Sequence, residues 1–192
     1  LMTVRPPSLG TRVLLAVECR ALARPMSKEQ SLATSEGLQA FARAVEQTAR
    51  RARGVVLSFS GGRAIIGCAG KDGLKQILRG ARYLRRDSDL MDLLAGSLAF
   101  AIHQGDIVEG EVRLGQNATP VAAGGAIYQL ERLLAEAAEA HVVIAKPLLD
   151  EALTILPLNV RAVVGIVSGR NFPGIAIDQL DTLEPLAAGA LD

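Results

Sequence analysis

The chain has 192 residues, with 21 Lys and Arg against 20 Asp and Glu, which leaves a formal net charge of +1. This length is enough for one domain with a real core, and the 49% of apolar residues exclude wholesale disorder. The balanced charge gives no reason to expect a nucleic-acid or membrane-surface protein. Two cysteines exclude a disulfide framework and a zinc site. No apolar run reaches the roughly 18 residues that span a bilayer, so we expect a cytoplasmic protein without membrane insertion.

The first part of the chain predicts strands and a helix in alternation. After a lead-in over residues 1–10 that we expect to be disordered, the apolar run 12–18 indicates a buried strand. Residues 27–53 repeat apolar positions at three- and four-residue spacing, which predicts a helix. Two β-like runs flank the pair Gly61-Gly62, which is typical of a hairpin turn, and these runs are 55–60 and 63–68.

The middle of the chain predicts two more helices around a second hairpin. Residues 72–86 carry one apolar face and predict a helix. Runs 97–103 and 106–113 indicate two strands, with the turn between them at Gln104-Gly105. A polar loop is expected over 114–120, followed by a long helix over 121–140.

The remaining elements are shorter. We expect a strand, a helix and two closing strands, over residues 141–145, 147–153, 160–168 and 175–179. Because hairpins lie inside this order, a purely parallel sheet is excluded. The pattern predicts an α+β fold with a ferredoxin-like βαββαβ core and a mostly antiparallel sheet flanked by helices. One domain is expected over residues 11–180, with a flexible tail over 181–192.

Four short stretches together resemble a known family. They are 14–22 (LLAVECRAL), 59–63 (FSGGR), 101–110 (AIHQGDIVEG) and 126–133 (AIYQLERL). In this order they resemble the first strand, the Gly-Asp-Gly hairpin, the Ile-His-x-Gly turn and the Asn/Arg helix of class III adenylate/guanylate cyclase homology domains. The resemblance covers most of the chain and implies the nucleotide cyclase fold.

The resemblance implies a metal site, and the residues here are poor in ligands for it. In the family, two Asp residues hold the two divalent cations that bridge the triphosphate. Their positions correspond to Glu18 and Gly61, and no Asp or Glu lies between Gly54 and Gly70. One carboxylate cannot bridge two hard cations, so Glu18 is a weak metal candidate. We expect no cofactor, and Mg²⁺ or Mn²⁺ only if the chain is an active cyclase.

The nucleotide-binding positions implied by the resemblance are also degenerate. Leu57 and Gly125 stand where the family reads the purine base with Lys and Asp, and neither side chain can pair with a base edge. Tyr128 replaces the Asn of the transition-state pair. Arg132 matches the Arg that stabilises phosphoryl charge, and it is the retained catalytic candidate.

Two main functions remain open. The first is a catalytically inactive, cyclase-like signalling module that forms a homodimer, pairs with a cyclase-type domain or binds a nucleotide-like ligand. A small-ligand sensor with a repurposed pocket lined by Leu57, Tyr128 and Arg132 is a further possibility. The alternative is a divergent adenylate or guanylate cyclase that converts a nucleoside triphosphate to the cyclic monophosphate and pyrophosphate with Glu18 and Arg132. No nucleic-acid partner is expected.

Other polar residues have structural interpretations. His103 is expected at a strand end, and Cys19 and Cys68 as buried apolar side chains. The basic helix end of Arg79, Arg82, Arg85 and Arg86 is interpreted as a solvated face, with an anionic partner as the alternative.

Overall fold

The computed structural model describes residues 8–23, 31–87, 90, 98–114, 117–137, 142–155, 162–167 and 170–175. Six strands form the main sheet in the order β2-β3-β1-β4-β5, with β6 paired to β4. The elements that build the first half are β1 (Ser8–Cys19), α1 (Ser31–Arg51), β2 (Val55–Ser60), β3 (Arg63–Cys68), α2 (Gly73–Arg86) and β4 (Leu98–Leu114). This is the predicted βαββαβ order. Every pairing in the main sheet is antiparallel except that of β6 with β4, so the predicted fold class is confirmed.

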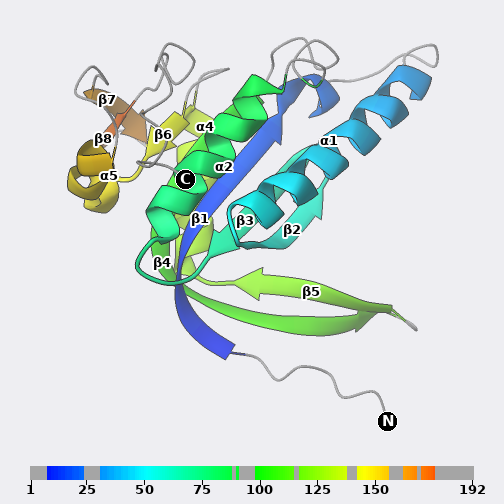
Figure 1. The fold of residues 1–192 in the computed structure, drawn as a ribbon, viewed down its shortest axis with the longest axis horizontal. Coiled ribbons are helices and arrows are strands. Elements are labelled where there is room, and N and C mark those ends of the chain that lie inside the picture. The colour runs from blue at the N-terminus through cyan, green and yellow to red at the C-terminus, as the bar shows by residue number, and fades with distance from the viewer. Residues whose placement is uncertain are drawn as a thin grey trace.

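Alternation along β1 divides the core into two layers. Val13, Leu15 and Val17 belong to the cluster that packs against α1 and α2. Leu14 and Ala16 point to the opposite face and pack with α4 (Gly125–Glu136). Since successive side chains of a strand alternate between faces, one strand supplies both layers. Figure 1 shows α1 and α2 lying over the front of the sheet, and β4 and β5 (Asn117–Ala123) extending away from it as an arm.

The predicted turn at Gln104-Gly105 is wrong, because β4 runs through it as one strand of 17 residues. All of β1, from Ser8 to Cys19, pairs with β4 from Leu98 to Glu109, and this ladder would break if the chain turned. Gly105 has a different role, since a Cβ there would lie 2.7 Å from the Cβ of Ala126 at the start of α4.

Three boundaries move as a consequence. The expected loop 114–120 is mostly strand β5, which pairs with the outer half of β4. The helix expected over 121–140 begins only at Gly125, because residues 121–123 remain in that ladder, and it ends at Glu136. Strand β1 begins at Ser8, so the last three residues of the expected lead-in are ordered by pairing with β4, while residues 1–7 lie outside the described part.

The last described elements are β6 (Val142–Ile144), η3 (Lys146–Leu148), α5 (Leu149–Ile155), β7 (Ala162–Val167) and β8 (Arg170–Ile175). β7 confirms the expected strand near 160–168. Its partner is β8 and not the expected 175–179, because Val167 pairs directly with Arg170 across a short connection. Residues 176–192, which include the expected tail, lie outside the described part. No helix among the described residues combines the length and hydropathy needed to cross a bilayer.

Replacing Gly105 tests the close approach of α4 to β4. We expect Gly105→Ala to lower the free energy of unfolding by about 1–3 kcal/mol, because the added methyl group overlaps Ala126. Gly125→Ala is the control, since a Cβ at Gly125 meets nothing within 4 Å. Urea unfolding of both variants measures the difference, and equal stabilities would contradict the packing argument.

Candidate functional site

Glu18 and Gly61 meet at one corner of the sheet. Glu18 lies near the end of β1 and stands directly opposite Arg63 on β3. The β2–β3 turn has φ values of +55° at Gly61 and +83° at Gly62, a left-handed conformation that favours glycine. The backbone N–H of Cys19 donates to the carbonyl of Gly62 at 2.8 Å, which holds this turn against the end of β1. The structure therefore brings together the two positions at which the cyclase resemblance implies metal ligands.

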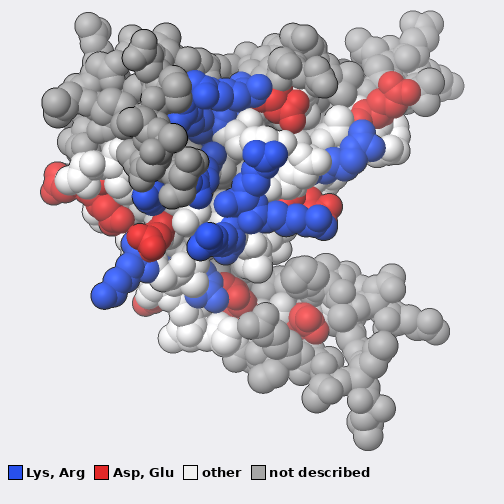
Figure 2. Space-filling model, viewed as in Figure 1, with Lys and Arg blue, Asp and Glu red and all other residues white. Residues whose placement is uncertain are grey.

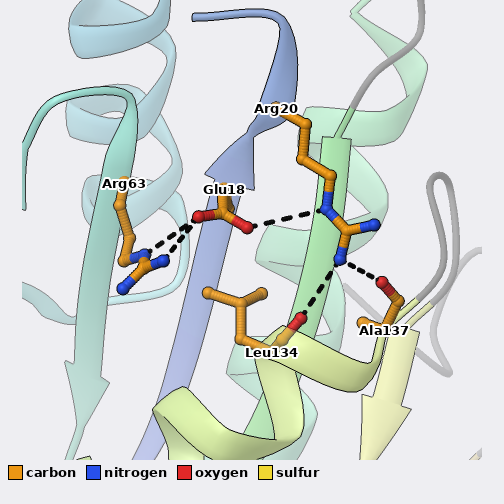
Figure 3. A network of polar contacts seen from close by, with 5 residues as sticks. All are labelled: Glu18, Arg20, Arg63, Leu134 and Ala137. Carbon is orange, nitrogen blue, oxygen red and sulfur yellow. Dashed lines mark hydrogen bonds and ion pairs between the residues drawn. The ribbon is translucent and has the colours of Figure 1, made fainter. Parts of the chain in front are cut away.

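The carboxylate of Glu18 is held between two guanidinium groups (Figure 3). Arg63 donates to Oε1 through Nη2 at 2.5 Å and through Nε at 3.2 Å. Arg20, in the 3-10 helix η1 (Arg20–Ala23), places its Nε 3.6 Å from Oε2. The Glu18 side chain is only 15% exposed, so it has exchanged most of its water for these two cations.

Arg20 also connects this corner to the end of α4. Its Nη2 donates to the carbonyl of Leu134 at 3.4 Å and to the carbonyl of Ala137. Carbonyls in the last turn of a helix have no partner within the helix, and that end carries partial negative charge. Arg20 therefore satisfies both the helix end and Glu18, and it joins β1 to α4.

These residues do not fit a pair of divalent cations. Each oxygen of Glu18 already faces a guanidinium, and a cation placed there would meet two positive charges at close range. Gly61 offers no side chain, although a Cβ at this position would meet nothing within 4 Å. Within the described residues, no three or more His, Cys, Asp or Glu side chains gather in an arrangement suited to a metal.

The positions expected on α4 lie along its exposed side. Gly125 is the first residue of the helix, and Tyr128 follows in the first turn and is 59% exposed. The guanidinium carbon of Arg132 lies 5.5 Å from the centre of the Tyr128 ring, which is a cation–π contact one turn apart. The structure brings Tyr128 and Arg132 together.

Leu57 lies in the core. It is 6% exposed and packs in the α4-side cluster, where its Cδ1 would be 2.7 Å from a Cβ on Gly67. It also borders a cavity of about 250 Å³ between β2 and the β4–β5 arm. Other residues that line this cavity are Arg12, Val55, Glu109, Glu111 and Val121. Arg12 binds both oxygens of Glu109, at 2.6 and 3.3 Å. Because Glu111 is a second carboxylate in the lining and Arg12 is its one cation, the lining has a net negative charge.

His103 lies within β4, opposite Leu14, and not at the expected strand end, whereas the cysteines are buried as expected. The Nδ1 of His103 is buried without a hydrogen-bond partner within the described residues, and burial lowers the pKa of this imidazole below its usual 6.5. Cys19 and Cys68 are both buried. Burial raises the pKa of the Cys68 thiol to about 11, and its Sγ lies 3.1 Å from the carbonyl of Ala52 as a donor. This thiol is therefore protonated and unreactive at neutral pH.

A sheet that carries β1, the β2–β3 hairpin and α4 in this arrangement is the fold of class III nucleotide cyclase domains, and solved structures confirm the predicted resemblance at the level of the fold. The guanylyl cyclase Cya2 matches with a TM-score of 0.68 and 12% identity over 88% of this chain and 90% of its own. The dimeric guanylyl cyclase domain of the RhoGC fusion protein from Blastocladiella emersonii matches with a TM-score of 0.62 and 9% identity over 88% of this chain and 96% of its own.

A third structure is a class III adenylyl cyclase-like ATP-binding protein from Pseudomonas aeruginosa. It matches with a TM-score of 0.57 and 14% identity, over 73% of this chain and 34% of its own length. No protein-family model matches the sequence, and a search of curated proteins gives no match either.

Sequence reasoning missed Arg20 and Arg63 as the partners of Glu18. Both residues lie inside stretches that carry the cyclase resemblance, and a basic residue directly after a Gly-Gly turn is a usable signal. The signal is incomplete, because Arg63 meets Glu18 only through the β1–β3 register, which joins residues 45 positions apart.

Removing the charge of Glu18 tests whether its contacts with Arg63 and Arg20 stabilise the fold. We expect Glu18→Gln to lower the free energy of unfolding by about 1–2 kcal/mol, because two partly buried guanidinium groups lose their counter-charge. The matched control is Glu46→Gln, which breaks an exposed pair with Arg50 at 2.6 Å and should cost less than about 0.5 kcal/mol. Denaturant unfolding of both variants measures the difference, and a cost for Glu18→Gln no larger than that of the control would refute the network.

Burial of His103 predicts a pH effect on stability. Because its pKa is lower in the folded chain than in the unfolded chain, the unfolded chain takes up the proton first as pH falls below about 6.5. We therefore expect stability to be unaffected by His103 above this pH and to fall below it. Unfolding at about pH 7.5 and about pH 5.5 should show a larger loss for the wild type than for His103→Gln. Parallel losses in the two proteins would show that His103 titrates normally.

Proposed function

We propose that this domain does not cyclise nucleotides and acts as an interaction module of the cyclase fold that associates with a second copy. The observation that carries the proposal is the capture of Glu18 between Arg63 and Arg20. A cyclase-type reaction needs two cations bridged by carboxylates. Here the remaining carboxylate is committed to cations of the protein itself, so the site lacks the means to assemble that centre.

Charge elsewhere on this side of the sheet supports the same proposal. The cavity between β2 and the arm is bordered by Glu109 and Glu111 against the single cation of Arg12. A triphosphate is strongly anionic, and this lining, in which Arg12 neutralises Glu109 and Glu111 remains, repels it in the absence of bridging metal. Leu57, at the expected base-reading position, packs across Gly67 and offers no polar atom to a base.

Association is supported by the apolar side chains left exposed on the arm and beside it. Val108, Val112 and Val121 are 43%, 45% and 40% exposed. Leu9 pairs with Val108 and is 74% exposed, and Gly110 pairs with Val121, so these side chains lie on one face of neighbouring strands. A contiguous exposed apolar patch of this kind marks a protein–protein contact. The RhoGC domain, which has the same fold, is a non-canonical dimer.

A designed gain of metal binding tests the catalytic half of the proposal. Wild-type protein should show no saturable binding of Mn²⁺ and should yield no cyclic nucleotide from ATP or GTP. The double variant Gly61→Asp/Arg63→Gln supplies a second carboxylate and releases Glu18 from one guanidinium. Asp tolerates the left-handed φ of +55° at this position, and a side chain has open space there. We therefore expect this variant to bind Mn²⁺ in a calorimetric titration.

The matched control is Gly61→Asn/Arg63→Gln, which has the same shape without the added charge and should not bind Mn²⁺. Cyclic product formed by wild-type protein alone, or saturable binding of Mn²⁺ to it, would overturn the assignment of an inactive domain.

Introducing a charged residue on the arm tests whether two copies of the domain associate through it. We expect wild-type protein to sediment as a dimer and Val112→Glu to sediment as a monomer, because a buried unpaired carboxylate disfavours the contact. Gln39→Glu adds the same charge at an exposed position of α1, outside the arm, and should leave the dimer intact. Sedimentation velocity measures all three, and a monomeric wild type at micromolar concentration would be evidence against the module as proposed.

A further inference from the structure

Positive charge gathers on helix α2. Between Gly73 and Arg86 the helix carries five basic residues and no acidic residue, a net charge of +5 in a chain whose total is +1. The basic residues are Lys75, Arg79, Arg82, Arg85 and Arg86. Charge is therefore segregated within the fold, and the balanced total conceals it.

The spacing of these residues places most of them on one stripe. Lys75, Arg79, Arg82 and Arg86 follow one another at intervals of four, three and four residues, which is one side of an α-helix. The opposite side is buried against the sheet and α1, through Leu74, Ile77, Leu78, Ala81 and Leu84. Within the basic stripe Arg86 is exposed and Lys75 and Arg79 are half-buried, while the Nε of Arg82 is buried. Figure 2 shows Lys and Arg side chains gathered over α2 and the adjoining part of α1.

Helix α1 widens this basic face. Gly80 lets the two helices approach closely, since a Cβ there would lie 3.0 Å from Cγ2 of Thr48. Across this contact the guanidinium carbon of Arg51 lies 3.9 Å from the ring centre of Tyr83, whose hydroxyl donates to Gln47 at 2.8 Å. Arg43 and Arg53 are exposed on and just after α1. Glu36 and Glu46 are also exposed on α1, and Glu46 pairs with Arg50, but basic residues outnumber acidic ones across the two helices.

The composition of this surface favours binding to the outside of a charged ligand, because it has no large apolar side chain that could insert into one. The large exposed apolar side chains of the described residues lie on β1, β2, the arm and α4, and none lies on α1 or α2. The aromatic ring on this surface, Tyr83, is covered by Arg51 and offers no platform on which bases stack. Sequence-specific binding of duplex DNA needs an element that enters a groove, whereas α1 and α2 lie flat against the sheet. A plane of anionic groups is the ligand that remains.

We propose that the α1–α2 face docks this domain on a lipid bilayer rich in anionic phospholipid. A fluid bilayer suits such a face, because anionic headgroups can move laterally to meet each cation without a fixed spacing. Guanidinium groups bind phosphate in two-point contacts, and Lys and Arg stems lie along the surface while their charges reach outward. The apolar patch proposed for association lies on the arm and at Leu9, outside the two helices that form the basic face.

Vesicle sedimentation tests the docking. Wild-type protein should bind vesicles of phosphatidylglycerol and phosphatidylcholine and not vesicles of phosphatidylcholine alone. Binding should disappear as salt is raised from about 0.1 M to about 1 M, because the screening length falls from about 10 Å to about 3 Å. The assay contains neither nucleotide nor Mn²⁺, so its outcome is separate from those of the cyclase and sedimentation-velocity tests.

Matched variants locate the surface. Lys75→Gln/Arg79→Gln removes two positive charges from α2 and should weaken binding about 30-fold, at about a factor of five for each charge. Gln104→Glu/Gln129→Glu changes the net charge by the same amount at exposed positions of β4 and α4, and it should leave binding nearly unchanged. Circular dichroism checks that both variants fold.

Three results would overturn the proposal. The first is no binding of the wild type to anionic vesicles, and the second is an equal loss in the two double variants, which would mean that only total charge matters. The third is binding to a short DNA duplex, sensitive to Lys75→Gln/Arg79→Gln, by a protein that does not bind vesicles, which would assign the face to nucleic acid.

Discussion

The chemistry of this fold depends on how one partly buried carboxylate is neutralised. Glu18 stands at the end of the central strand, where it is only 15% exposed, and an anion in that position needs cations or strong donors close by. The chain supplies them from itself, with Arg63 across the β1–β3 ladder and Arg20 just beyond the strand. The same arrangement caps the carbonyls at the end of α4, so one set of contacts joins β1, β3 and α4. A corner that is held together in this way has no vacant carboxylate for an external ion.

The domain presents a basic surface on two helices and an apolar surface on its arm. Alternate residues of β1 build a layer under α1 and α2 and another under α4, so each face of the sheet has its own covering and its own outer chemistry. The α1–α2 covering is basic, because the apolar stripe of α2 is used in the core and five of its other positions are cationic. Beyond the covered part, the β4–β5 arm leaves valine side chains exposed. A formal charge of +1 describes neither surface.

Local patterns were sufficient where a single physical cause produced them. The Gly61-Gly62 turn follows from the need for positive φ at both positions, and α2 follows from the spacing of its apolar residues. The turn expected at Gln104-Gly105 failed because glycine has more than one use. At Gly61 it permits a turn, whereas at Gly105 it permits α4 to pack against a continuous strand. A local pattern cannot distinguish these uses, since the residue that needs the space, Ala126, is distant in sequence.

The sequence by itself determined that the β2–β3 hairpin has no carboxylate, because no Asp or Glu lies between Gly54 and Gly70 in any alignment. It also determined the βαββαβ order, since hydrophobic periodicity and turn residues act over short distances. Only the tertiary structure decided what Glu18 does. Its partners are chosen by the register of β1 on β3 and by where α4 ends, and both depend on packing between segments far apart in the chain.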